Sequence, residues 1–562
     1  MNGVPNQSTG TITGSGGTRF SGKVTNNKGD YDDKSTIESG TFTGEVVNDG
    51  GTILSGDFSG ATLRGTLVIT FNPDNGEPTS TQEVNWSKDG ATLTAPTPVP
   101  TKEGYTLDGW YYDNSGRRTK WDFDTDKVKY TMTLTAQWKE ALTASGTAEV
   151  STAAELTSAL ENTAKDTVKL TADITIDATL TVNRTVTLDL DGHVLRYDSA
   201  DRDSVFVIEG GHLTIQDSNT GGLSHGFKVD ESTKLWILDK TNGTNTVNGG
   251  VITGGTGHPV LLGSSSYTYY SYRGGAVYII DGQLTMTGGS IVGCSATDGG
   301  GVCMDPPTGQ KGRFWMTGGS SIVGCSTTDG GGVYACAAGS FFDMRGTAVI
   351  HDCRCGGSGV RAYGTFRMLD QAVIRGCTAE SATQKVYGGG VYVNSSNFEM
   401  SDQAKIEDCQ AISTSSSYAS LGGGVYGANN TLLTLSGSAV IQNCTAKNSA
   451  DSSETYGGGV SASRMGQITL KDSARIAQCN TANGSGLYIT GVPNDPSFGK
   501  FYADGGSVDG DVVLGNGRDL CIISGSGGTE FNGKVTVAPG STIENWNLYL
   551  HISEKQIKQN ER

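Results

Sequence analysis

Cysteine recurs in a repeated four-residue phrase, Ile-x-x-Cys, between residues 291 and 479. A thiol can coordinate a metal, form a disulfide or act as a nucleophile, so this series is the first candidate for chemistry. Successive copies are 24 to 35 residues apart, which suits one turn of a solenoid and would stack the thiols in a straight column. The series consists of Cys294, Cys325, Cys353, Cys377, Cys409, Cys444 and Cys479.

A straight column is poorly suited to either metal binding or cross-linking. Zinc needs four ligands that converge tetrahedrally, and a disulfide between stacked strands is strained because the Cβ vectors run parallel. We therefore expect a structural ladder of reduced thiols, with no metal ligands and no cofactor. Disulfides or a metal site are the alternatives. Four further cysteines, Cys303, Cys336, Cys355 and Cys521, lie outside the series.

Tyrosines form the second group of candidates, because their rings stack on sugars and on protein partners. Four lie in one short segment, Tyr267, Tyr269, Tyr270 and Tyr272, and these are the candidate ligand-binding residues. Another four, Tyr278, Tyr334, Tyr392 and Tyr426, each follow a valine. In a strand whose valine points inward, the tyrosine points outward, so this second set could equally well only shield the sheet.

Acidic and histidine residues offer weaker signals. Asp298, Asp329, Asp352 and Asp408 recur beside the repeated phrases and could form a calcium-binding row. We prefer the reading in which each aspartate caps its own turn. His225 and His258 are single histidines in glycine-rich loops, and we expect them to be solvated. Paired carboxylates or a base with a basic partner, as polysaccharide cleavage requires, are not recognisable, so we predict no catalytic residues and no enzyme activity.

A glycine phrase followed by valine positions these residues. It occurs six times between Gly274 and Val460, alternating with the Ile-x-x-Cys phrase. Glycine is needed where the backbone turns through positive φ or where neighbouring turns approach closely. The alternation predicts an all-β chain whose main part, residues 151–562, is a right-handed parallel β-helix. The paired phrases resemble those of chlamydial polymorphic outer-membrane proteins and gut-bacterial surface proteins, with cysteine here in place of their asparagine.

A short helix is expected to cover the first coil. Thr152 and Glu155 have the spacing of a capping box, and Leu156 and Leu160 lie four residues apart. Alternating apolar and polar residues then predict strands from Val168 to His193. This order resembles the entry to pectin-lyase-type β-helices, and residues 140–150 are expected to be the linker that precedes it.

Two smaller regions precede the linker. Residues 1–68 repeat a short phrase that contains Phe20, Phe42 and Phe58, which predicts short glycine-rich solenoid repeats. In residues 69–139, Pro100 to Tyr111 and Leu134 to Trp138 resemble the Listeria-Bacteroides repeat, also called the internalin B-repeat. That resemblance implies a small β-grasp-like domain used as a spacer or ligand-binding unit in secreted surface proteins. Tyr105, Trp110 and Trp138 are expected to form its core.

Charge and hydropathy restrict the partners. The net charge is −17 and the basic residues are scattered, so nucleic acid is excluded as a partner. No apolar run approaches the roughly 20 residues that cross a bilayer, and neither end has a recognisable signal or anchor. We expect a secreted or cell-surface fragment that does not span the membrane, whose targeting signals lie outside it.

The resemblances and the repeat geometry predict an extracellular bacterial cell-surface protein for adhesion or for ligand or glycan binding and display. Its partners would be glycans or host or bacterial surface proteins. One alternative is a polysaccharide lyase or glycoside hydrolase with its site between Tyr197 and Tyr272, and another is a structural spacer stalk. Long irregular loops between Arg196 and Tyr272 would favour a binding or catalytic face, and regular coils would favour the spacer.

Overall fold

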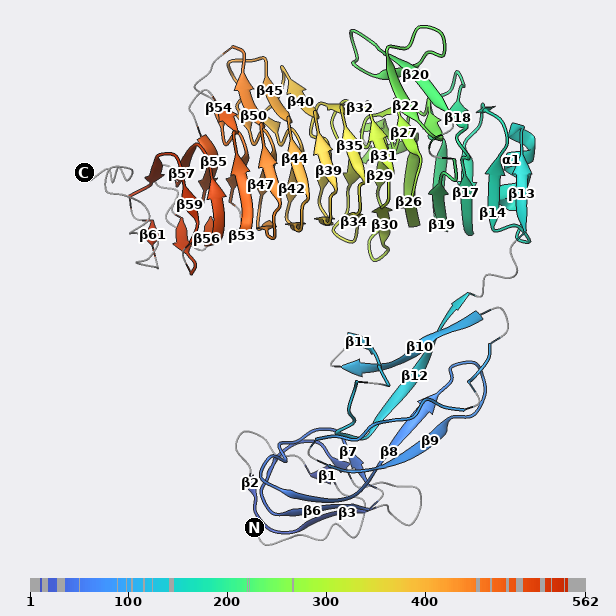
Figure 1. The fold of residues 1–562 in the computed structure, drawn as a ribbon, viewed down its shortest axis with the longest axis vertical. Coiled ribbons are helices and arrows are strands. Elements are labelled where there is room, and N and C mark those ends of the chain that lie inside the picture. Colours follow the sequence, from blue (N-terminus) through green and yellow to red (C-terminus); the bar gives the residue numbers. More distant parts are fainter. Residues whose placement is uncertain are drawn as a thin grey trace. The chain divides into compact units, whose positions relative to one another are not determined.

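The computed structural model divides the chain into two compact units, Met1–Ala144 and Ser145–Arg562 (Figure 1). It describes residues 11–543 except 13–18, 28–35, 50, 88, 98, 103–104, 115–116, 124, 141–145, 220, 222, 265–266, 451–454, 465–466, 482–484, 492–498, 516–520, 527 and 540.

The first unit starts as a small solenoid of parallel strands. Its three stacks are β1 (Thr11–Ile12), β4 (Thr36–Ile37) and β7 (Thr52–Ile53); β2 (Arg19–Phe20) and β5 (Thr41–Phe42); and β3 (Val24–Asn27), β6 (Glu45–Asp49) and β8 (Thr62–Asn72). The phenylalanines of the repeated phrase stack directly, with ring centroids 4.9 Å apart for Phe20 and Phe42 and 4.8 Å apart for Phe42 and Phe58. Each copy of the phrase is therefore one coil.

Strand β8 joins these coils to the rest of the first unit. Its first residues pair with β6, and its later residues pair with β9 (Ser80–Asn85) and β12 (Met132–Glu140). The sheet continues to β10 (Tyr105–Asn114) and β11 (Arg117–Lys120). The boundary expected between residues 68 and 69 thus falls inside one strand. Of the three aromatics expected in the core, Trp110 is buried there and Trp138 is partly buried against the core cluster, but Tyr105 is 39% exposed.

The second unit opens with β13 (Thr147–Val150) and α1 (Ala153–Glu161). The Thr152 hydroxyl accepts a hydrogen bond from the Glu155 amide at 3.3 Å, and the Glu155 carboxylate accepts one from the Thr152 amide at 3.1 Å. Leu156 and Leu160 are buried against the first coils. The predicted capping box and short helix are confirmed.

The rest of this unit is a parallel β-helix whose coils stack in register on three faces (Figure 1). The valine face contains β16 (Leu180–Val182), β19 (Phe206–Gln216), β26 (Val277–Met286), β29 (Val302–Met304), β33 (Val333–Ala335), β37 (Val360–Ala362), β42 (Val391–Asn394), β47 (Val425–Ala428), β52 (Val460–Ser463), β55 (Ser485–Thr490), β57 (Asp511–Leu514) and β60 (Val535–Val537).

The phenylalanine face contains β14 (Thr167–Leu170), β17 (Thr185–Asp189), the second halves of β19 and β26, β30 (Gly312–Met316), β34 (Phe341–Met344), β38 (Thr365–Met368), β43 (Asn397–Met400), β48 (Leu432–Leu435), β53 (Gln467–Ala477), β56 (Lys500–Val508), β58 (Ile522–Ser524) and β61 (Thr542–Ile543). The isoleucine face contains β15 (Ile174–Ile176), β18 (Val194–Tyr197), β23 (Val251–Thr253), β27 (Ser290–Val292), β31 (Ser321–Val323), β35 (Val349–His351), β39 (Val373–Arg375), β44 (Lys405–Glu407), β49 (Val440–Gln442) and β59 (Glu530–Phe531), with the ends of β53 and β56.

A separate stack of short strands follows the cysteine of each coil, and we name it the polar sheet. It consists of β28 (Ser295–Ala296), β32 (Ser326–Thr327), β36 (Arg354–Cys355), β40 (Thr378–Ser381), β45 (Gln410–Ser413), β50 (Thr445–Asn448) and β54 (Asn480–Thr481). The longer coils add β41 (Val386–Tyr387), β46 (Ser420–Leu421) and β51 (Thr455–Tyr456) before they return to the valine face.

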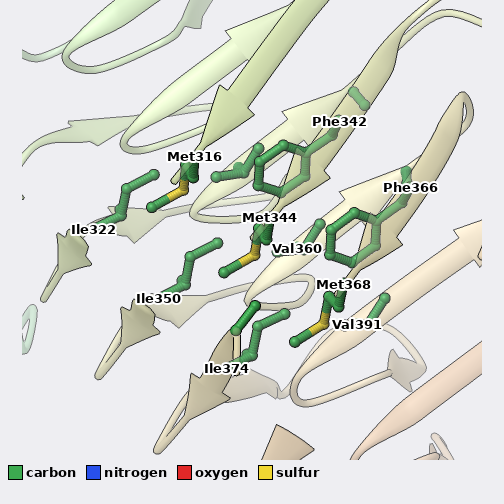
Figure 2. Packing of buried hydrophobic residues seen from close by; sticks show 14 of the residues in the cluster. Met316, Ile322, Phe342, Met344, Ile350, Val360, Phe366, Met368, Ile374 and Val391 are labelled. Atoms are coloured by element: carbon green, nitrogen blue, oxygen red, sulfur yellow. The ribbon is translucent and has the colours of Figure 1, made fainter. Parts of the chain in front are cut away.

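Identical side chains stack through the core, one per coil. Figure 2 shows the columns of methionine, isoleucine and phenylalanine. Neighbouring rings of Phe314, Phe342, Phe366 and Phe398 lie 4.8 Å apart and are parallel to within 6°. The ring spacing equals the separation of hydrogen-bonded strands, about 4.8 Å, so each ring contacts the next without any gap.

Two antiparallel excursions interrupt the regular coils. Strands β20 (Ser224–Val229), β21 (Trp236–Leu238) and β22 (Asn245–Asn248) form an inserted sheet between β19 and β23. Strands β24 (His258–Ser264) and β25 (Tyr267–Arg273) form a hairpin between β23 and β26. The inserted sheet projects from the side of the helix (Figure 1). Both excursions lie between Arg196 and Arg273, almost wholly in the segment where long irregular loops would favour a binding or catalytic face and regular coils would favour a spacer.

Candidate functional site

The hairpin β24–β25 carries the predicted tyrosines, and it presents two of them to solvent. Tyr269 is 49% exposed and Tyr270 is 61% exposed. Tyr270 lies directly across the hairpin from Leu261, which is 59% exposed. Cross-strand partners point to the same side of a hairpin, so Tyr270 and Leu261 form one apolar patch. The side chain of Tyr267 lies outside the described residues.

The fourth predicted residue, Tyr272, has a different role. The Arg202 guanidinium lies 3.7 Å from the centre of its ring, and the Tyr272 carbonyl accepts a hydrogen bond from the Thr297 amide at 2.8 Å. A ring already covered by a cation on one face is less available to a ligand. Tyr272 therefore anchors the hairpin to the next coil, while Tyr269 and Tyr270 extend from it.

A partly buried polar network fixes the base of the hairpin. Nδ1 of His258 lies 2.7 Å from Oδ1 of Asp203, and the His258 ring stacks on Tyr278 at 5.4 Å. Burial opposes ionisation of Asp203, but hydrogen bonds from His258 and the Ser204 amide hold the pKa of Asp203 below its usual value. Arg273, at the end of β25, forms an ion pair with Asp305. His258, expected to be a solvated loop residue, is instead a structural partner.

The second tyrosine set forms a column on the outside of the valine face. Tyr278, Cys303, Tyr334, Arg361, Tyr392 and Tyr426 occupy successive register positions. The guanidinium of Arg361 lies 5.6, 5.5 and 5.0 Å from the ring centres of Tyr334, Tyr363 and Tyr392. Burial raises the pKa of Tyr278 to about 12. Because these rings contact one another and Arg361, the column covers the sheet and does not offer open ring faces.

The four aspartates do not share one column. Asp352 and Asp408 directly precede ladder cysteines and have φ of 54° and 57°. Gly293, Gly324, Gly376, Asn443 and Gln478 hold the same turn position with φ between 53° and 62°. Asp298 and Asp329 instead lie before the glycine phrases, where Arg361 contacts Asp329 at 3.4 Å and Ser271 contacts Asp298 at 3.3 Å. This arrangement matches turn formation, because aspartate and asparagine tolerate the left-handed region.

The seven ladder cysteines stack as reduced thiols, each at most 4% exposed. Burial raises the pKa values of Cys294 and Cys325 far above the usual range of a thiol, so the thiolate form is suppressed. Later members donate to the carbonyl two residues before them, as Cys409 does to Glu407 at 3.3 Å and Cys444 to Gln442 at 3.2 Å. Within the described part of the chain, no three histidine, cysteine or acidic side chains cluster as metal ligands would.

The inserted sheet was not predicted from the sequence. It covers the outer side of the isoleucine face, where Phe227 packs on Val194, Val251, Val292 and Val323. Trp236 lies over the turns at Gly293 and Gly324, and its ring meets the His351 ring at 6.0 Å. The turn residue before cysteine is glycine in both coils that Trp236 covers, but Gly376 holds the same position in a coil that Trp236 does not cover, so this residue alone does not signal the sheet.

Comparisons with known proteins agree with this architecture. Residues 68–137 match the Listeria-Bacteroides repeat domain, and residues 147–269 match a family described as "Putative pectate lyase-like adhesive domain". The second match ends within the hairpin β24–β25 and includes the inserted sheet.

Two curated relatives come from Evansella cellulosilytica. A "Putative membrane protein" is 40% identical over 71 residues, covering 13% of this chain and 10% of the relative. A "Putative Gly-rich membrane protein" is 38% identical over 72 residues, covering 13% of this chain and 8% of the relative. The matched part is about a tenth of the length of these relatives. No solved structure matches the chain significantly.

No helix in the described residues is long and apolar enough to cross a lipid bilayer. The chain thus contains a segment that matches the Listeria-Bacteroides repeat, followed by a β-helix whose first coils match the family described as a pectate lyase-like adhesive domain.

Proposed function

We propose that this chain is an extracellular bacterial surface protein that mediates adhesion, and that the hairpin β24–β25 makes the contact. The observation that carries the proposal is the exposure of Leu261, Tyr269 and Tyr270 on an excursion from a β-helix whose apolar side chains are otherwise largely buried. The description of the matching family as adhesive supports the same role.

The physical basis is the burial of aromatic surface on binding. Tyrosine combines a large apolar ring with a hydroxyl that hydrogen-bonds, and tyrosines are enriched among residues that dominate binding energy. Asp203, His258 and Arg273 hold the base of the hairpin in place, so this part loses little conformational freedom on contact. A net charge of −17 favours an uncharged glycan or a protein surface over a polyanion.

A second candidate function is polysaccharide cleavage, because Asp203 and His258 form a hydrogen-bonded pair at the base of the same hairpin. A histidine oriented by a carboxylate can act as a general base. Cleavage would release new chain ends, whereas adhesion would only retain the protein.

The test incubates the full chain with insoluble plant, host and bacterial polysaccharides and with immobilised surface proteins, and measures retention and release of chain ends. Adhesion predicts retention without release, and loss of retention in the double variant Tyr269→Ser/Tyr270→Ser. Tyr105→Ser and Leu432→Ser are matched controls, since these residues are 39% and 45% exposed elsewhere. Release that is abolished by His258→Ala would establish the enzyme instead. If the chain is neither retained nor releases chain ends, the structural spacer is the remaining function.

A further inference from the structure

A polar groove follows the outside of the polar sheet, and none of the hairpin tyrosines lines it. It encloses about 370 Å³, within the size range of sites that bind small organic ligands. Hydroxyl groups and one ion pair dominate its lining, which includes Thr233, Ser326, Arg354, Glu380, Ser381 and Thr414.

The groove is elongated along the helix axis. Ser326 and Arg354, which line the groove, are register partners on successive strands of the polar sheet. Their column continues in Thr378 and Gln410, but the lining shifts along the next two strands to Glu380 and Thr414. The lining takes residues from four successive coils, at 326, 354, 380 and 414. Three steps of about 4.8 Å between strands give a length of about 14 Å. An extended chain would therefore fit it better than a compact molecule.

The charges in the groove compensate each other. The Arg354 guanidinium is paired with the Glu380 carboxylate, and the two side chains are 33% and 30% exposed. An anionic ligand would meet Glu380 and the chain's net charge of −17, and a cationic ligand would meet Arg354. A paired guanidinium and carboxylate still have unused donors and acceptors, and these match the hydroxyl groups of an uncharged ligand.

The inserted sheet supplies a rigid wall at one end. Thr233 belongs to the turn between β20 and β21, and the Asp230 carboxylate accepts hydrogen bonds from the Thr233 amide at 2.7 Å and hydroxyl at 2.8 Å. Ser232 donates to the same carboxylate through its hydroxyl at 2.7 Å and its amide at 3.1 Å. The turn is also held by Trp236 against the coil at Gly324. A wall ordered before binding lowers the entropy cost of binding.

We propose that this groove binds an extended, uncharged oligosaccharide that lies along the helix axis. The proposal deepens the adhesive function by naming a ligand class, and it rests on that function for the expectation that the chain meets polysaccharides. The binding residues are nevertheless different from those of the hairpin. Failure of one site therefore does not imply failure of the other.

The test is calorimetric titration of the full chain with uncharged gluco-, xylo- and manno-oligosaccharides of increasing length. For at least one series, affinity should rise with length until the groove is filled and then level off. Glu380→Gln should weaken binding on the order of tenfold, because a hydrogen bond to a charged group is replaced by a weaker neutral one. Thr414→Trp, at an exposed position at the far end, should block the longer ligands.

The matched control is Lys447→Gln. Lys447 occupies the register position of Glu380 two coils further on, is exposed, and lies outside the groove. It should leave the affinity unchanged. Tyr269→Ser/Tyr270→Ser should also bind oligosaccharides normally while losing retention on immobilised surface proteins.

Three results would overturn the inference: no binding of any series, equal affinities for the wild type, Glu380→Gln and Thr414→Trp, or tighter binding of oligogalacturonates than of uncharged chains. If retention on surfaces persists while the titrations show no binding, the groove proposal fails and the hairpin proposal stands. If oligosaccharides bind in the groove but the tyrosine double variant is retained normally on immobilised surface proteins, the hairpin proposal fails and the groove stands.

Discussion

The indole of Trp236 lies directly on the backbone of Gly324, so a Cβ at position 324 would come within 2.2 Å of the indole Cδ1 atom. The Trp236 amide also donates to the Gly324 carbonyl at 3.2 Å. Docking of the inserted sheet therefore requires glycine at 324, as it does at 293, where a Cβ would lie 1.7 Å from the Trp236 carbonyl oxygen.

Gly324→Ala is expected to detach the inserted sheet while the coils persist. Overpacking against the indole costs about 1–3 kcal/mol, and a φ of 57° adds strain for alanine. Limited proteolysis should then cleave between residues 217 and 250, and Trp236 fluorescence should shift toward that of exposed tryptophan. Gly319→Ala is the control, because a Cβ there meets no atom within 4 Å. Equal protease resistance of both variants would contradict the docking role.

Phe342→Ala is expected to lower stability by about 3–5 kcal/mol, because it leaves a cavity in the stack. The ring is fully buried, with Phe314 and Phe366 each 4.8 Å away. In a solenoid each coil is stabilised by its neighbours, so the loss extends beyond one coil. Urea unfolding followed by circular dichroism measures it. Phe341→Ala, on the outward side of the same strand, should cost clearly less, and equal losses would argue against the stacked core.

Alkylation of the native protein is expected to modify Cys336 first. All eleven cysteines lie in the described residues; Cys336 is half-buried, and the other ten are buried. Burial raises the pKa of Cys303, as it does for the ladder members Cys294 and Cys325, so moderately alkaline pH should not make these thiols reactive. Mass spectrometry of iodoacetamide-treated protein gives the order of modification. Early labelling of any ladder cysteine would contradict the buried column.

The base of the hairpin is expected to loosen in acid. The pKa of Asp203 is lower in the folded chain than in the unfolded one. Ionised Asp203 therefore contributes its full stabilisation of the folded chain at any pH above its unfolded pKa. That contribution is lost as the pH falls from the usual aspartate range toward the lower folded pKa. Protease cleavage of β24–β25 should therefore rise below about pH 4. Asp203→Asn should be cleaved faster than wild type at pH 7, and the difference should vanish in acid. If the difference in cleavage rate between the two proteins stays the same at all pH values, the protonation of Asp203 does not cause the loosening.

Local patterns in the sequence determined the β-helix. Alternation along a strand turns the valine or the isoleucine of each phrase inward. The cysteine lies three residues after the isoleucine and faces inward as well, because the residue before it turns the backbone through positive φ. The turn before each cysteine holds glycine, aspartate, asparagine or glutamine at positive φ, and the first three of these residue types suit that conformation. The capping box at Thr152 and Glu155 spans one helical turn. Each of these features depends on neighbours a few residues away, and each could therefore be predicted from the sequence without the structure.

Tertiary packing decided the roles of the functional candidates. Tyr270 and Tyr272 are two residues apart, yet only the placement of Arg202 makes Tyr272 an anchor. His258 keeps 31% of its side chain exposed, but its ring is oriented by Asp203, which lies 55 residues earlier in the chain. The groove needs Thr233 from an excursion and Glu380 from a coil far along the chain. Such contacts join residues that the sequence leaves distant, and side-chain burial and pairing follow from where the coils bring them together in space.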